Sequence, residues 1–99
     1  EPDRIGGYAM GHLANDEALL KRTRRIAGQV SAIERALISG KDCPTMLHLA
    51  AATRGAMNGL MDAIIEAHVH EHVARPDLTD SERAAGAEEL IAAIRRYSK

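Results

Sequence analysis

Residues 43–76 read CPTMLHLAAATRGAMNGLMDAIIEAHVHEHVARP. Asp42 supplies a capping acid just before this stretch, and proline is tolerated in the first turn of a helix, so Cys43-Pro44 is a typical helix start. Pro76 would end the helix. Between these points apolar residues recur at helical spacing along two stripes, which indicates a long central helix covered on two sides. One stripe contains Leu47, Ala50, Met57, Met61, Ile64 and His68, and the other contains Met46, Leu49, Thr53, Ala56 and Leu60.

Helical patterns flank the central stretch on both sides. Before it, the apolar residues that follow Asn15 or Asp16 step by four and three up to Gly40, as in a coiled-coil seam. After it, Thr79-Asp80-Ser81-Glu82 matches a capping box, which begins another helix. We therefore predict an all-α fold with helices at about 15–39, 43–74 and 79–97, in one domain over residues 14–99. Residues 1–13 are expected to form a flexible tail, in which residues 1–9 are either native or vector-derived; in the second case Met10 would be the native start.

The chain has 99 residues, of which 45% are hydrophobic and 2% aromatic. A chain this short forms one domain at most and exposes much of its surface when alone, so self-association is expected. The single cysteine excludes an internal disulfide, and no apolar run approaches the roughly 20 residues that cross a bilayer. Because there is no secretory signal either, we expect a cytoplasmic protein without a membrane partner. The formal net charge of -1 gives no overall attraction to nucleic acid, which would have to bind a local basic patch.

Two histidines four residues apart, His68 and His72, would lie on one face of the central helix, within reach of a single metal ion. This spacing is also common on solvated helix faces, so by itself it does not indicate a site. Cys43 adds a soft thiolate, and a mixed thiolate and imidazole set suits nickel, cobalt or zinc better than magnesium or calcium. No catalytic nucleophile with its base and no phosphate-binding loop can be assigned, so an enzyme is not expected.

Cys43 and His68 cannot reach one ion within a single chain. About 25 residues of continuous helix, at about 1.5 Å per residue, would separate them by about 37 Å. Antiparallel pairing of two copies of this helix would instead bring Cys43 of one copy beside His68 and His72 of the other. Small residues near the midpoint, around Gly55, would let the two backbones approach closely. His12, upstream of the first helix, is a candidate fourth ligand, although a lone histidine in a tail is usually only solvated.

Four cations fall within five positions of the first predicted helix: Lys21, Arg22, Arg24 and Arg25. Such runs usually form a solvated face, but no acid is interleaved here, so a polyanion would relieve their mutual repulsion. Arg54 lies within the central helix, where it must pair with an acid or face solvent, because burying an unpaired guanidinium is too costly. In a symmetric assembly, a second copy would repeat this basic patch and make the positive surface wider. Contacts from its Lys and Arg side chains to phosphates would bind double-stranded DNA without a helix-turn-helix.

Four segments together resemble the CsoR/RcnR family of bacterial repressors. They are RTRRIAGQV at 22–30, Cys43-Pro44, AAATRGAMNGL at 50–60 and HVHEH at 68–72. The resemblance covers nearly all of the chain from His12 onward. It implies a three-helix protomer with a long central helix, an antiparallel helical dimer and a dimer-of-dimers tetramer. It also implies that the metal-free protein binds operator DNA and that a ligand weakens this binding.

The resemblance further implies the ligands of the sensor site. Cys43 and His68 match the family's shared thiol and imidazole, which different protomers contribute, and His72 stands where nickel and cobalt sensors carry a histidine. Copper sensors carry a second cysteine there, so nickel or cobalt is the predicted effector, zinc would also fit, and Cu(I) is disfavoured. His12 resembles the N-terminal histidine of the nickel and cobalt members, although it is one residue out of their spacing. Glu88 matches an acid on the third helix that supports the site.

The resemblance therefore implies a repressor of metal-efflux genes, in which Arg22 and Arg25 match positions that contact DNA in relatives. Two alternatives stay open. The first two helices are also close to those of formaldehyde sensors of this fold, in which Cys43 would be a reactive thiol and not a ligand. The other alternative is a metal-buffering helical bundle without a role on DNA.

Overall fold

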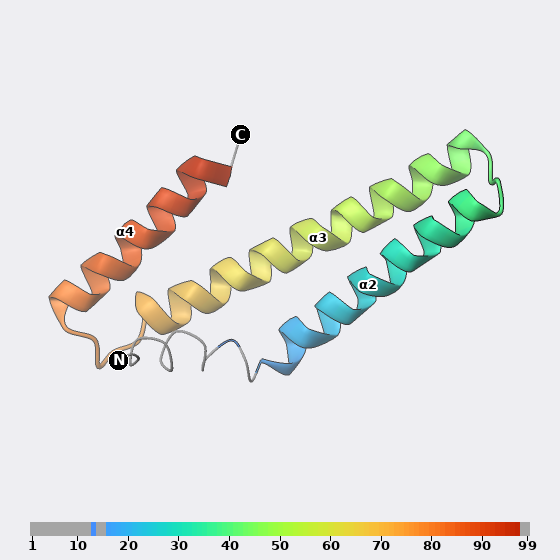
Figure 1. The fold of residues 1–99 in the computed structure, drawn as a ribbon. Helices are drawn as coiled ribbons and strands as arrows, with labels where there is room; N and C mark the ends of the chain where they lie inside the picture. Colours follow the sequence, from blue (N-terminus) through green and yellow to red (C-terminus); the bar gives the residue numbers. More distant parts are fainter. Residues whose placement is uncertain (1–12, 14–15, 98–99) are drawn as a thin grey trace. The chain divides into compact units, whose positions relative to one another are not determined.

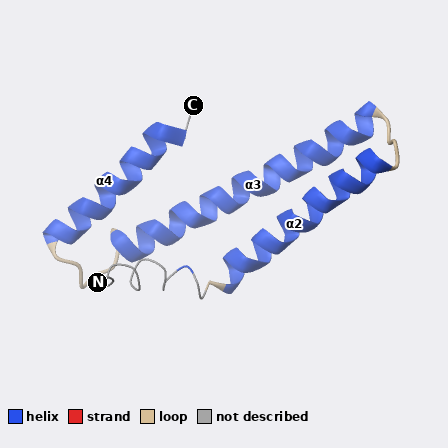
Figure 2. Ribbon diagram, viewed as in Figure 1, coloured by secondary structure: helices blue, strands red, loops and turns tan. Residues whose placement is uncertain are grey.

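The computed structural model describes residues 13 and 16–97, which contain three helices (Figure 1). They are α2 (Glu17–Ile38), α3 (Cys43–His72) and α4 (Asp80–Tyr97). The described residues include no strand (Figure 2), and the predicted all-α fold is confirmed. Each helix begins and ends within two residues of the position that the sequence predicts. The predicted tail, apart from Leu13, lies outside the described residues.

Local capping determines where α2 and α3 begin. The side chain of Asp16 accepts a hydrogen bond from the backbone N–H of Leu19 at 3.0 Å and so caps α2. Gly40, with a φ of 73°, makes the left-handed turn after α2 that glycine tolerates. Asp42 then accepts a hydrogen bond from the backbone N–H of Thr45 at 3.0 Å and caps α3. Hydrogen bonds from Thr45 hold the pKa of Asp42 below its usual value.

The chain divides into two compact units, of which the first comprises Ala14–Asp62 and the second contains Ala63–Lys99. In the first unit, α2 runs antiparallel to the first part of α3 (Figure 1). The α3 stripe that contains Met46, Leu49 and Thr53 is half-buried in this unit. Because α2 is the only other helix among the described residues of the unit, we infer that α2 covers this stripe.

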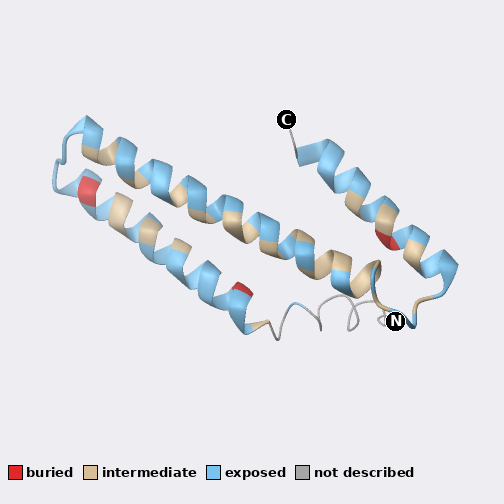
Figure 3. Cartoon of the chain, turned by 180° about the vertical axis from the view of Figure 1, so that it is seen from behind, coloured by how far each residue is buried: buried red, intermediate tan, exposed pale blue. Residues whose placement is uncertain are grey.

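Most of the other stripe of α3 is open to solvent. Leu47, Met57 and Met61 are 65%, 52% and 49% exposed, so within the first unit the chain covers the central helix on one side and not on two as predicted, whereas His68, the last member of the stripe, is half-buried. Buried positions are few and lie on α2 and α4 (Figure 3). Among the described residues, Leu19 and Ala36 of α2 are the only buried hydrophobic residues. The chain therefore presents apolar side chains that a second molecule can cover.

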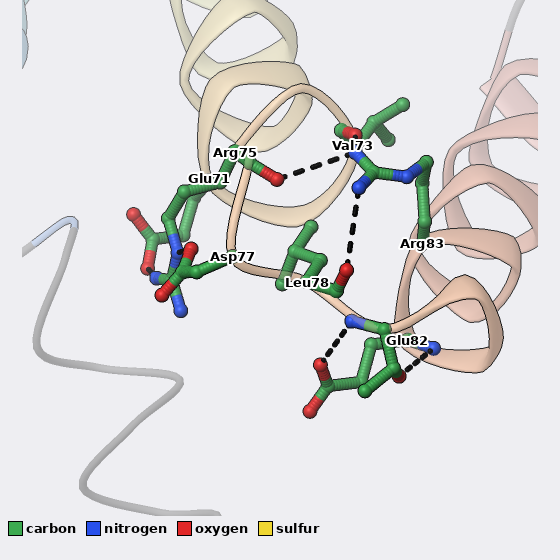
Figure 4. Close-up of polar contacts among 8 residues, drawn as sticks. Glu71, Val73, Arg75, Asp77, Leu78, Glu82 and Arg83 are labelled. Carbon is green, nitrogen blue, oxygen red and sulfur yellow. Dashed lines mark hydrogen bonds and ion pairs between the residues drawn. The ribbon is translucent and has the colours of Figure 1, made fainter.

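In the second unit, Arg83 ties the start of α4 to the turn that follows α3 (Figure 4). Its guanidinium donates to the carbonyl oxygen of Val73, to that of Arg75 at 3.2 Å and to that of Leu78 at 3.3 Å. Carbonyl groups at and after the end of a helix lack partners within the helix. One charged side chain thus satisfies several of these groups and holds the turn closed.

Thr79 and Glu82 form the predicted capping box at the start of α4 (Figure 4). The backbone N–H of Thr79 donates to Oε1 of Glu82 at 2.8 Å, and the backbone N–H of Glu82 donates to Oγ1 of Thr79 at 3.0 Å. In the same turn, Arg75 forms ion pairs with Glu71 and Asp77. The hydrogen bond from Arg75 holds the pKa of Asp77 below its usual value.

Candidate functional site

His68 and His72 lie side by side near the end of α3. Their ring centroids are 4.8 Å apart, and the ring planes are tilted by 47°. Both residues are half-buried. The four-residue spacing therefore places the two imidazoles together on one face, where two ring nitrogens could bind one metal ion.

The ring of His68 is anchored by α4. Its Nε2 lies 2.8 Å from the carbonyl oxygen of Gly86. Because a carbonyl oxygen only accepts hydrogen bonds, Nε2 must carry the proton and donate it. In a neutral ring this leaves Nδ1 as the nitrogen with a lone pair. A hydrogen bond from the second ring nitrogen is the usual way in which proteins orient a metal-binding histidine.

Cys43 is the first residue of α3, and its thiol is exposed. His68 and His72 belong to the same continuous helix near its other end, so one chain does not bring the thiol to the imidazoles. Among the described residues, no group of three or more His, Cys, Asp or Glu side chains could hold a metal ion. The donors themselves, one thiolate and two imidazoles, fit nickel, cobalt or zinc when two chains share them.

The structure also locates the remaining residues predicted for the metal site. His12 lies outside the described residues. Glu88 is exposed on α4, whereas Oε1 of Glu89 lies 4.0 Å from Nε2 of His68. Sequence reasoning did not identify Gly86, the acceptor for His68. An isolated glycine in a helical pattern lowers helix stability by about 1 kcal/mol relative to alanine and so often has a packing reason, which is the signal that could have identified it.

The basic cluster of α2 is exposed at all four positions, Lys21, Arg22, Arg24 and Arg25. One of its members also contacts α3, since Nη1 of Arg22 lies 3.0 Å from the place where a Cβ on Gly59 would stand. Arg54 is exposed on α3, so of the two predicted alternatives it faces solvent. The first unit therefore carries accessible positive charge that could meet the phosphates of a nucleic acid.

A small chain whose described part is helical, with exposed cations, one exposed thiol and a histidine pair, has the features of a ligand-sensing regulator. A family model described as "Metal-sensitive transcriptional repressor" matches residues 15–96. The chain belongs to this family of metal-sensitive transcriptional repressors, which are regulators of transcription and not enzymes. Membership implies metal binding, DNA binding and self-association. No helix among the described residues is long and apolar enough to span a membrane.

Individual relatives agree with this assignment. The chain is 47% identical over 91 residues to an uncharacterised protein encoded in the bioA 5' region of Serratia marcescens, covering 91% of this chain and all of that protein. It is 43% identical over 65 residues to the transcriptional repressor RcnR of Salmonella arizonae, covering 65% of this chain and 72% of that protein. A solved structure of a variant of the formaldehyde-responsive regulator FrmR from Salmonella enterica serovar Typhimurium matches with a TM-score of 0.76 and 43% identity, covering 82% of this chain and 91% of that chain.

Proposed function

We propose that this chain is a nickel- or cobalt-responsive repressor, in which metal binding at Cys43, His68 and His72 releases operator DNA and derepresses metal-efflux genes in the cytoplasm. The observation that carries the proposal is the pair of imidazoles, with ring centroids 4.8 Å apart, near one end of a helix whose other end carries an exposed thiol. When bound, the metal would supply a positive centre that accepts a thiolate from one chain and imidazoles from another.

Antiparallel pairing of α3 between two copies would complete the site. Between the thiol end and the histidine end lies the exposed apolar stripe that includes Leu47, Met57 and Met61. A two-fold axis across this stripe would bury it in both copies and create two equivalent metal sites. Assembly of two such dimers into a tetramer is the form that the CsoR/RcnR resemblance favours.

The exposed cations of α2, together with Arg54 of α3, form the proposed DNA-binding surface. Two-fold symmetry would repeat this surface, so that several phosphates of double-stranded operator DNA are contacted at once. Metal can release the DNA only if it binds more tightly to a state of the protein that binds DNA less tightly. We propose that the two states differ in how the helices of paired chains are placed.

Calorimetric titration with Ni(II), Co(II), Zn(II) and Cu(I), followed by an operator-release assay with each metal, tests the proposal. Cys43→Ala and His68→Ala should lower nickel affinity by more than the roughly 10- to 100-fold that loss of a supporting residue costs, while both variants still bind DNA. His70→Ala is the matched control, because His70 is exposed on the same helix between the two proposed ligands. Normal nickel-driven release in Cys43→Ala or His68→Ala would refute the site.

A formaldehyde-responsive repressor is a second candidate function. Two observations favour it, namely the structural match to a formaldehyde-responsive regulator at 43% identity and the exposed thiol of Cys43. In that case formaldehyde would release DNA from metal-free protein, and nickel would not. A third outcome, tight metal binding by a protein that binds no DNA under any condition, would instead indicate a metal-buffering bundle.

A further inference from the structure

Helix α4 approaches the end of α3 very closely at Gly86. Gly86 is the one buried residue of α4. A Cβ built at this position would overlap the carbonyl oxygen of His72 and would lie 2.8 Å from the Cβ of His72. These atoms belong to the backbone of α3 or are fixed directly to it, so they cannot move aside as the end of a flexible side chain can. The contact therefore admits no side chain at position 86.

The backbone conformation at position 86 does not require a glycine. Among the described residues, Gly40 is the only one with a positive φ, so Gly86 has an ordinary helical backbone that alanine could also adopt. Gly28 and Gly55 are different, since a Cβ at either would meet nothing within 4 Å. Glycine inside a helix costs about 1 kcal/mol relative to alanine, so the close contact with His72 is the physical reason for Gly86.

Gly86 also holds the ring of His68. Its carbonyl oxygen accepts the hydrogen bond from Nε2 of His68 at 2.8 Å, and the two lone pairs of a carbonyl allow this bond beside the one within the helix. Residues three positions before and after Gly86 face the same end of α3. Arg83 donates to the carbonyl oxygen of Val73, and Oε1 of Glu89 lies 4.0 Å from Nε2 of His68. One face of α4 is therefore fitted to the histidine end of α3.

We infer that Gly86 is a positioning residue for the metal site. Because Gly86 has no side chain, α4 can contact His72. Its carbonyl oxygen accepts the hydrogen bond from Nε2 of His68 and so fixes the orientation of the ring. The inference rests on the proposed function, because the ring orientation matters for sensing only if His68 and His72 bind metal. Filling the contact with a methyl group would move α4 away and release His68, although neither proposed ligand is changed.

NMR spectroscopy of the metal-free protein tests the positioning itself. The Nε2–H proton of His68 should be visible and protected from solvent exchange in the wild type, with a coupling across the hydrogen bond to the labelled carbonyl carbon of Gly86. Gly86→Ala should lose both signals. Gly28→Ala is the control, because a Cβ at position 28 would meet nothing within 4 Å. Gly28→Ala and Glu89→Gln should both keep the protected proton and the coupling. Absence of the coupling in the wild type overturns the inference even if Gly86→Ala does not fold, and loss of the signals in Glu89→Gln would assign the positioning to Glu89.

Nickel titration then separates this inference from the proposed function. Gly86→Ala should lower nickel affinity by about 10- to 100-fold, the range expected for residues that orient a metal ligand. Gly28→Ala should bind nickel as the wild type does. If His68→Ala abolishes nickel binding and Gly86→Ala binds normally, only the role of Gly86 is refuted. If neither variant changes nickel binding, the metal site is refuted together with this inference.

Discussion

The two compact units of the chain are stabilised in different ways. In Ala14–Asp62, Leu19 and Ala36 are the only buried hydrophobic residues that the structure describes, and much of the apolar surface of α3 is exposed. In the unit that contains Ala63–Lys99, polar contacts from Arg83 close the turn, and Gly86 brings α4 against the histidine pair. The first unit therefore leaves an apolar surface for another molecule to cover, whereas the second unit supplies its own contacts to the histidines.

The largest effect is expected from a charge placed on the exposed stripe of α3. Met57→Glu would put a carboxylate into the proposed interface in both copies, and burying an unpaired charge costs several kcal/mol per ion. We expect loss of self-association and a large fall in melting temperature, measured by light scattering and circular dichroism. Asn58→Glu, at the neighbouring exposed position, is the control. An unchanged mass and melting temperature in Met57→Glu would show that this stripe is not the interface.

A smaller effect is expected in the second unit, from Arg83→Met. Methionine keeps the apolar stem of the side chain but removes the donors to the carbonyl oxygens of Arg75 and Leu78. Hydrogen bonds that involve a charged group contribute about 1.5–3 kcal/mol, so the free energy of unfolding should fall by about 2 kcal/mol. Urea denaturation measures this loss, with Arg95→Met as control. Equal losses in the two variants would mean that the turn does not depend on Arg83.

The positions at which the helices begin could be predicted from the sequence, because they depend on hydrogen bonds between residues close together in the chain. Asp42 before Cys43-Pro44 and the capping box of Thr79 and Glu82 act within one helical turn, and the helices begin where these signals place them. The histidine pair was predictable for the same reason, since a four-residue spacing on a helix is a local property.

Contacts between helices were not predictable in the same way. Gly86 against His72 and Arg22 against Gly59 depend on how far apart two helices pack, which no local pattern records. The rotation of α4 about its axis determines which of its acids lies near His68, and in this structure that acid is Glu89. Coverage of α3 on two sides was predicted, but within the first unit the chain covers only one of the two stripes.

Thr79→Ala should weaken the second unit by less than Arg83→Met does. It removes the hydroxyl that accepts the backbone N–H of Glu82 at 3.0 Å, and loss of such a cap costs about 1 kcal/mol. The free energy of unfolding, measured in urea, should fall by that amount. Ser81→Ala lies within the same helical turn and should change stability much less. If Ser81→Ala proves as destabilising as Thr79→Ala, the capping box is not the source of the effect.

The smallest effect concerns the cap of α3 in the first unit and depends on pH. Hydrogen bonds from Thr45 lower the pKa of Asp42 from its usual value of 3.8, so the ionised carboxylate favours the folded state. A group whose pKa is lower in the folded state contributes stability above its unfolded pKa and loses it as the pH falls through the folded pKa. Asp42→Ala should therefore melt slightly below the wild type at neutral pH, and the difference should shrink below pH 3.8. A difference in melting temperature that stays constant down to low pH would show that the charge of Asp42 does not cap α3.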